Sequence, residues 1–229
     1  MDIQKELRVY TDKDKVLNYQ RFFKTGPGEY GEGDKFLGVT VPKIHIVAKK
    51  SSSTSFENIK KLLESPYHEE RMMALFILVE QFGKGDEKLR KQIFNFYLKN
   101  RKGINNWDLV DSSAYKIVGA YLIDKPKDVL YKFAKSKNLW DRRIAIVSTA
   151  YFIRQNSFDD TIAISEILLN DKHDLIHKAV GWMLREVGKR DVKILENFLK
   201  KHSQNMPRTM LRYSIEKFPE AKRKQYLKG

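Results

Sequence analysis

Trp107 and Asp111 form the pair of side chains in this 229-residue sequence that is best suited to chemistry. They are four residues apart, so on a helix they share one face. A carboxylate beside an indole can stabilise a developing cation or position an attacking water molecule. The alternative is an aspartate at a helix start that a salt bridge satisfies, since surface pairs of this kind are common.

A second indole, Trp182, lies off the apolar side of its helix. Next to it stand the cations Lys178 and Arg185. This placement favours an aromatic contact to a nucleotide, with phosphates held by the cations, although a neighbouring repeat could also cover the ring. At 100° per residue, the apolar side gathers Ala179, Val180, Met183, Leu184 and Val187.

Two adjacent arginines, Arg142 and Arg143, follow Trp140 and Asp141 at a predicted helix start. Adjacent side chains point about 100° apart on a helix, so at most one of the two can face a bound polyanion squarely. The helix geometry leaves open which arginine does so.

The charge balance of the chain is basic. Lys and Arg number 44 against 29 Asp and Glu, a net charge of +15, and the pI is about 9.7. Such a balance points to a polyanionic partner, most simply nucleic acid, although a solvated lysine-rich surface gives the same composition. The chain has no cysteine, which excludes disulfides, Cys-ligated zinc, iron–sulfur clusters and thiol nucleophiles. We expect a cytoplasmic protein without a secretory signal or membrane span.

His173 and His177 resemble the ligand pair of a metalloprotease helix, with an Asp between them in place of Glu. The sequence offers no obvious third ligand. A helix N-terminus capped by Asp171 or Asp174 accounts for the same residues without a metal. We therefore expect no metal and no cofactor.

The segment 25–34 is a glycine-rich loop in which Gly26, Gly28 and Gly31 fit the G-x-G-x-x-G pattern of dinucleotide-binding proteins. No strand precedes the pattern, and the acidic residues Glu29 and Glu32 would repel a pyrophosphate. We interpret the segment as a plain loop. The run at residues 51–55 is predicted to be a loop that caps the next helix.

Helical periodicity covers almost the whole chain, and strand-like alternation is nearly absent, so the predicted fold class is all-α. The predicted helices are Phe56–Leu63, His68–Phe82, Glu87–Leu98, Asn106–Leu122, Lys127–Ala134, Trp140–Ile153, Asp160–Leu169, Asp174–Val187, Val192–Lys200 and Pro207–Phe218.

These helices pair into hairpins with a degenerate repeat. Five equivalent positions lie 30 to 40 residues apart, a spacing typical of HEAT-type repeats. Stacked hairpins predict a curved solenoid with a basic concave face. We expect one domain over residues 1–229, with a helical N-terminal part at 1–50 and stacked hairpins at 56–219. The equivalent positions are Arg71, Asp111, Arg142, Lys178 and Arg208.

Three segments together resemble the AlkD-like DNA alkylation repair family: residues 107–111, 138–145 and 179–186. The resemblance spans most of the chain. It implies a HEAT-like-repeat DNA glycosylase that excises cationic alkylpurines such as 3-methyladenine and 7-methylguanine. Where some members carry a substrate-side tyrosine, this chain has Phe22 or Phe23.

The resemblance also implies roles for single residues. Asp111 matches the family's catalytic aspartate, Trp107 and Trp182 match its paired tryptophans, and Arg143 rather than Arg142 matches its DNA-contacting arginine. An oxocarbenium-like sugar and its attacking water would then be stabilised by one carboxylate, as in glycoside hydrolysis.

We expect double-stranded DNA with alkylated bases as the partner, bound by a monomer through Arg143, Lys178, Arg185 and Arg142. A non-catalytic nucleic-acid-binding protein that recognises DNA structure is the alternative, and a protein-binding HEAT scaffold is a third hypothesis.

Overall fold

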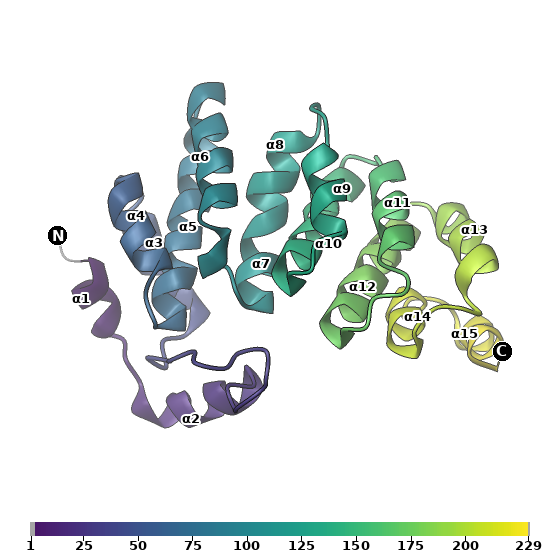
Figure 1. Cartoon of the computed structure of the whole chain (residues 1–229), viewed down its shortest axis with the longest axis horizontal. Coiled ribbons are helices and arrows are strands. Elements are labelled where there is room, and N and C mark those ends of the chain that lie inside the picture. The colour runs from purple at the N-terminus through teal and green to yellow at the C-terminus, as the bar shows by residue number, and fades with distance from the viewer. Residues whose placement is uncertain (1–2, 229) are drawn as a thin grey trace. The chain divides into compact units, whose positions relative to one another are not determined.

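The computed structural model describes residues 3–228, and helices dominate that part of the chain (Figure 1). The only β-type pairing in it is an isolated bridge between Lys35 and Tyr67. The prediction of an all-α fold is confirmed. None of the helices within these residues has both the length and the apolar character that a membrane span requires.

The chain divides into two compact units, residues 1–113 and 114–229. In a stack of helical repeats each repeat contacts only its neighbours, so such a division occurs within single domains as well as between domains. One domain over 1–229 therefore stays a prediction, and we describe each unit by itself.

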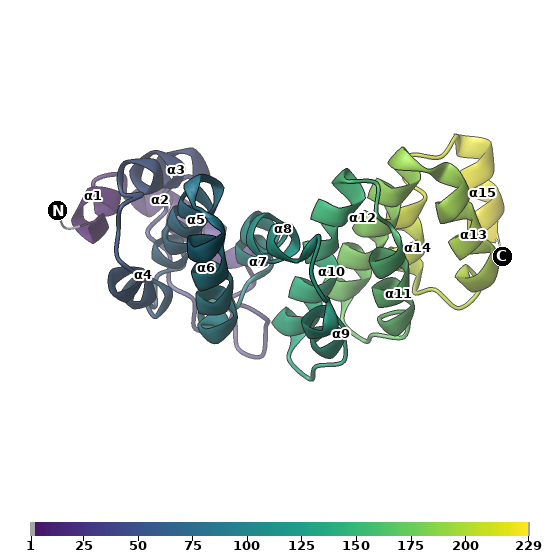
Figure 2. The same cartoon turned by 90° about the horizontal axis from the view of Figure 1, so that it is seen from above.

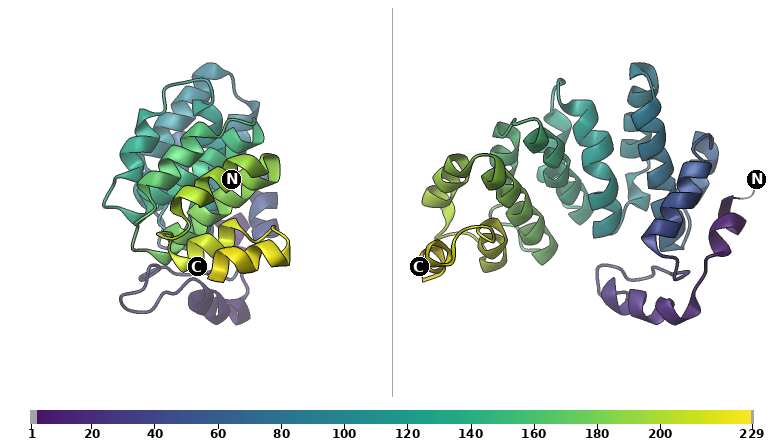
Figure 3. Two further views of the ribbon diagram at one scale, coloured as in Figure 1. Left: turned by 90° about the vertical axis from the view of Figure 1, so that its right-hand side faces the viewer. Right: turned by 180° about the vertical axis from the view of Figure 1, so that it is seen from behind.

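The first unit is built around α5, which is buried from its first turn to Leu78 and packs on both α3 and α4. The right-hand panel of Figure 3 shows α2 below the ends of α3 and α5. The helices of this unit are α1 (Ile3–Arg8), α2 (Lys13–Phe22), α3 (Val41–Lys50), α4 (Phe56–Leu63), α5 (His68–Lys84), α6 (Glu87–Lys99), the short 3-10 turn η1 (Arg101–Gly103) and α7 (Trp107–Ala114).

The second unit begins inside the helical stretch that the sequence predicts at Asn106–Leu122. This stretch continues from α7 through a π-helical segment, η2 (Tyr115–Gly119), into α8 (Ala120–Leu122). The remaining helices are α9 (Asp128–Ala134), α10 (Leu139–Arg154), α11 (Asp159–Ile167), α12 (Asp174–Arg190), α13 (Val192–His202), α14 (Arg208–Ser214) and α15 (Glu220–Lys228).

Helices α10, α12 and α14 pack one on the next, while α9, α11 and α13 lie against them as a second layer (Figure 2). Close approach of α12 to α14 requires a small residue at the contact. A Cβ atom added at Gly181 would lie 2.5 Å from the carbonyl oxygen of Met210. The contact between α12 and α14 therefore requires a residue as small as glycine at position 181.

The last predicted helix, Pro207–Phe218, is wrong at its C-terminal end. Helix α14 ends at Ser214, and a separate helix, α15, follows Pro219. The proline disfavours helical backbone at Phe218, which explains the break. The sequence of α15 is rich in lysine and has no apolar face, so its periodicity gave no signal.

Candidate functional site

Trp107 is the first residue of α7, and Asn106 caps the helix start. Asn106 is fully buried, and its Oδ1 atom accepts a hydrogen bond of 2.8 Å from the backbone N–H of Trp107. The indole stacks on Phe23, with ring centroids 5.6 Å apart, and meets the edge of Phe22 at 5.8 Å. The side chain of Asn106 therefore satisfies a backbone N–H group at the start of α7.

Asp111 lies one turn beyond Trp107 on α7 and is half-buried. The carboxylate of Asp111 interacts electrostatically with the fully buried Tyr97. The hydroxyl of Tyr97 lies 3.0 Å from the Ser113 hydroxyl. Burial raises the pKa of Tyr97, and the carboxylate of Asp111 adds to this effect. Indole and carboxylate therefore share one helix turn, as the spacing predicts.

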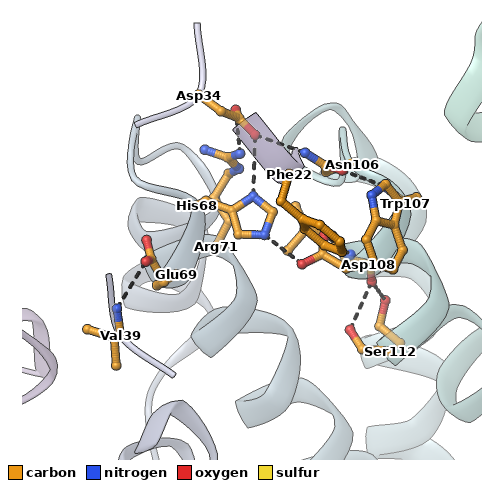
Figure 4. A network of polar contacts seen from close by, with 12 residues as sticks. Phe22, Asp34, Val39, His68, Glu69, Arg71, Asn106, Trp107, Asp108 and Ser112 are labelled. Carbon is orange, nitrogen blue, oxygen red and sulfur yellow. Dashed lines mark hydrogen bonds and ion pairs between the residues drawn. The ribbon is translucent and has the colours of Figure 1, made fainter. Parts of the chain in front are cut away.

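A cavity of about 670 Å³ opens beside Trp107 within the first unit. Its walls are mostly apolar and aromatic, and Figure 4 shows Phe22 and Trp107 on the same side of the polar network described next. The lining includes Tyr19, Phe22, Phe23, Phe36, Phe76 and Trp107.

A buried polar network lies at the base of Trp107 (Figure 4). The imidazole of His68 is between two carboxylates: Nδ1 lies 3.3 Å from Oδ2 of Asp34, and Nε2 lies 2.8 Å from Oδ2 of Asp108. Burial alone would lower the pKa of His68, but the charges and hydrogen bonds of Asp108 and Asp34 outweigh it and raise the pKa to about 9. The side chain is therefore a cation at neutral pH.

Arg71 and Asn106 complete this network around Asp34. Arg71 Nη2 donates to Oδ1 of Asp34 at 2.6 Å, and Asn106 Nδ2 donates to its Oδ2 at 3.2 Å. Burial opposes the charge of Asp34, yet hydrogen bonding from His68 and the charge of Arg71 hold its pKa below the ordinary value. The buried Asp34 and the largely buried Asp108 thus balance the two buried bases, His68 and Arg71.

Glu69, the residue after His68 on α5, holds the segment that enters α3. Its carboxylate accepts hydrogen bonds from the backbone N–H groups of Leu37, Gly38 and Val39 at 2.8 to 3.2 Å. Gly38 has a φ of +79°, and a Cβ atom there would lie 1.9 Å from the carbonyl oxygen of Asp12. Only glycine fits this position.

In the second unit, Trp182 is half-buried on α12. The apolar side predicted for this helix is confirmed, since Ala179, Val180, Met183, Leu184 and Val187 are all buried. Trp182 lies off that side, as the sequence predicts.

The two cations near Trp182 both have carboxylate partners. Lys178 Nζ lies 2.6 Å from Oδ2 of Asp174, and its side chain is 40% exposed. Arg185 pairs with Glu216 and also with Glu186, whose Oε1 atom lies 3.4 Å from Nε.

Arg142 and Arg143 have different surroundings on α10. Arg142 pairs with Asp171 at 2.6 Å and donates to the carbonyl oxygens of Ser136 and Lys137, both at 3.0 Å. Arg143 is only 4% exposed and donates to the carbonyl oxygen of Leu175. The first therefore connects the turn after α9 to the loop before α12, and the second connects α10 to the start of α12.

The pair His173 and His177 belongs to a helix start, but the predicted cap is wrong. His173 itself is the N-cap residue, and its Nδ1 atom accepts from the backbone N–H of Leu175 at 3.1 Å. Asp171 holds the backbone N–H of His173 at 2.8 Å, and Asp174 begins the helix. Among the residues that the structure describes, no three His, Asp or Glu side chains are grouped as metal ligands.

The glycine-rich loop uses its acidic residues to bind its own backbone. Glu29 accepts from the N–H of Gly26 at 2.8 Å, and Glu32 accepts from the N–H of Gly28 at 2.9 Å. These N–H groups are therefore occupied by carboxylates, which agrees with the plain-loop interpretation. The cap expected from the run at 51–55 is Ser55, whose hydroxyl accepts from Asn58 N at 3.4 Å.

The structure thus groups the predicted residues by helix. Trp107 and Asp111 share α7 in the first unit, while in the second unit Arg142 and Arg143 share α10 and Lys178, Trp182 and Arg185 share α12.

The sequence analysis did not identify His68 and Asp108, because charged residues at a helix start are usually exposed to solvent. A usable signal was present: His68 to Arg71 are four polar residues directly before a continuous apolar run, and all four are buried.

Fold and site together define an all-α helical-repeat protein with an indole and a carboxylate on one helix turn. The sequence model of the family described as DNA alkylation repair enzyme matches residues 3–218. The chain therefore belongs to the DNA alkylation repair enzyme family, and this membership supports a role in the repair of alkylated DNA with DNA as the partner.

A solved structure from Enterococcus faecalis, described as a predicted DNA alkylation repair enzyme, has a similar fold. Its TM-score is 0.71 at 15% sequence identity, and the match covers 92% of this chain and 97% of that one. At this identity the likeness shows the fold alone. Among curated proteins, none matches this sequence.

Proposed function

We propose that the protein is a monofunctional DNA glycosylase that hydrolyses the N-glycosidic bond of cationic alkylated purines, of the 3-methyladenine and 7-methylguanine type, in double-stranded DNA. The observation that carries the proposal is the placement of Asp111 one turn beyond Trp107 on α7, where it is half-buried. A carboxylate is worth more to a developing cation where water is partly excluded.

The chemistry needs little more than this pair. Alkylation at N3 or N7 makes the purine a cation, so it leaves without a general acid. The remaining oxocarbenium-like sugar is stabilised by the negative charge of Asp111, which also orients the water that attacks it. The indole of Trp107 presents a π-face that favours positive charge on the sugar.

The second unit supplies DNA contacts in this proposal. Trp182 flanks the lesion's sugar–phosphate unit, and Lys178 and Arg185 on the same helix hold phosphates, together with Arg143 and Arg142 on α10. The carboxylate partners Asp174 and Glu216 do not prevent the phosphate contacts of Lys178 and Arg185, because a phosphate replaces an exposed carboxylate at small cost. We also propose that the protein acts as a monomer in the cytoplasm, at the nucleoid in a bacterial source.

The test is an Asp111→Asn variant assayed beside the wild type on a duplex with one 7-methylguanine. The variant keeps the side-chain shape and removes the charge, so base release should fall by at least about 100-fold, while the Kd for DNA stays within about twofold. An Asp128→Asn variant, at an exposed carboxylate in the first turn of α9, is the matched control for charge removal. Equal loss of binding and release in Asp111→Asn would contradict the catalytic role of Asp111. DNA binding by the wild type without base release would favour a non-catalytic DNA-binding protein.

A further inference from the structure

The polar network around His68 connects three segments that are distant in sequence. Asp34 ends the glycine-rich loop, His68 begins α5, and Asp108 lies in the first turn of α7. One imidazole contacts both carboxylates, at 3.3 Å and 2.8 Å. The imidazole of His68 is 2% exposed, and the side chains of Asp34 and Asp108 are 5% and 13% exposed.

Both chain neighbours of Trp107 are fixed by this network. Asn106, on one side, donates to Asp34 at 3.2 Å and accepts from the Trp107 backbone at 2.8 Å. Asp108, on the other side, contacts His68 through Oδ2 and accepts from the backbone N–H of Leu109 through Oδ1 at 2.8 Å. The backbone of Trp107 is therefore held from both directions.

The indole ring is connected to His68 by a second route. The imidazole packs against Phe23 with centroids 4.8 Å apart, and Phe23 stacks on Trp107 at 5.6 Å with an interplanar angle of 25°. A displacement of His68 would therefore shift both the backbone and the ring support of Trp107.

Stability alone is a poor explanation for this arrangement. Burying two acids and two bases costs desolvation free energy that their attraction only partly offsets, and apolar residues of similar volume are often as stable or more stable. What a hydrogen-bonded ionic network provides is a fixed geometry, because each partner has a defined direction. Trp107 is the candidate-site residue whose two chain neighbours and stacking partner this network contacts.

We propose that Asp34 and His68 are positioning residues that set the orientation of Trp107 through Asn106, Asp108 and Phe23. The glycine-rich loop thereby gains a function, since it delivers Asp34 to the start of α7. The structural part of this proposal stands on the contacts above, and its consequence for base release rests on the proposed glycosylase function.

The test uses the full chain labelled with 5-fluorotryptophan. The protein has three tryptophans, Trp107, Trp140 and Trp182, whose 19F resonances are assigned by single Trp→Phe variants. His68→Phe keeps the ring contact to Phe23 and removes both hydrogen bonds. Asp34→Asn is a milder second variant that decides the matter if the first does not fold.

The matched control is Leu78→Val, which lowers stability on the same helix without contacting the network. We expect the Trp107 resonance to shift or broaden in Asp34→Asn and His68→Phe, and the other two resonances to stay in place. None of the three should move in Leu78→Val. In Asp34→Asn and His68→Phe, base release in single turnover should fall about tenfold or more, because small displacements of catalytic groups slow the reaction strongly. The Kd for DNA should stay within about twofold of the wild-type value.

An unchanged Trp107 resonance in the folded variants, or an equal shift in Leu78→Val, would overturn the positioning role. So would a shifted resonance with an unaltered rate of base release. A shifted resonance in a protein whose wild type releases no base would keep the structural link and reject the glycosylase proposal, so the two failures can be told apart.

Discussion

The Nε2 atom of His68 lies 2.8 Å from Oδ2 of Asp108, the residue that directly follows Trp107 in the chain. This contact connects the start of α5 to the start of α7 inside the first unit. A buried histidine thus lies in contact with the first turn of the helix that carries Trp107 and Asp111.

The stability of the protein should fall as the pH rises through the raised pKa of His68, which is about 9 against an ordinary value of 6.5. Between these values the folded chain holds a proton that the unfolded chain has released. The stabilisation is complete below about 6.5 and is lost through about 9, and it amounts to at most about 3 kcal/mol. The charged groups that face the imidazole are Asp34, Asp108 and Arg71.

Urea unfolding at about pH 6 and about pH 9.5 checks this prediction. The wild type should lose free energy of unfolding between the two, and His68→Gln should lose much less. An equal loss in both proteins would show that His68 is not the titrating group. At the acid end the sign reverses: the lowered pKa of Asp34 gives stability that is present above its ordinary 3.8 and lost as the pH falls below it.

DNA affinity should depend steeply on salt, and Lys178 should contribute one counterion to that dependence. Replacing it with alanine is expected to reduce the slope of log K against log[salt] by about 0.9, while Lys178→Arg keeps the charge and the slope. Fluorescence anisotropy with unmodified duplex at several salt concentrations measures this. An equal slope in all three proteins would show that Lys178 does not contact DNA and stays paired with Asp174 when DNA is bound.

Two helical glycines should respond oppositely to alanine. Gly181, next to Trp182, would place a Cβ atom 2.5 Å from both Met210 O and Tyr213 Cβ, so Gly181→Ala should destabilise by about 1–3 kcal/mol. Gly83 in α5 has no atom within 4 Å of that position, so Gly83→Ala should stabilise by about 0.5–1 kcal/mol. Thermal unfolding distinguishes them, and a neutral Gly181→Ala would mean that α12 and α14 are not tightly packed.

Periodicity predicted most helices because the buried residues recur at helical spacing. The apolar side of α12 and the shared turn of Trp107 and Asp111 follow from the sequence in this way. It failed for α15, where Lys-rich sequence hides a helix without an apolar face, and it could not foresee a π-helical segment at Tyr115–Gly119.

The network around His68 was beyond sequence reasoning for a different reason. Asp34 and Asp108 are 74 positions apart in the chain and meet only through the tertiary fold. A single sequence carries no signal for such a contact, and the helix-cap rules that assign the cap at Ser55 act only on neighbouring residues. The cap of α12 shows the limit even there, because His173 replaced the expected aspartate.

Single-turnover release of free base from duplex DNA that carries one 7-methylguanine tests the glycosylase and the role of Asp111 together. We expect one free 7-methylguanine and one abasic site for each lesion with the wild-type protein, and almost none with Asp111→Asn at saturating protein. Release by Asp111→Asn at the wild-type rate would contradict the assignment of Asp111. Salt-sensitive DNA binding by the wild type without any release of 7-methylguanine or 3-methyladenine would contradict the glycosylase itself.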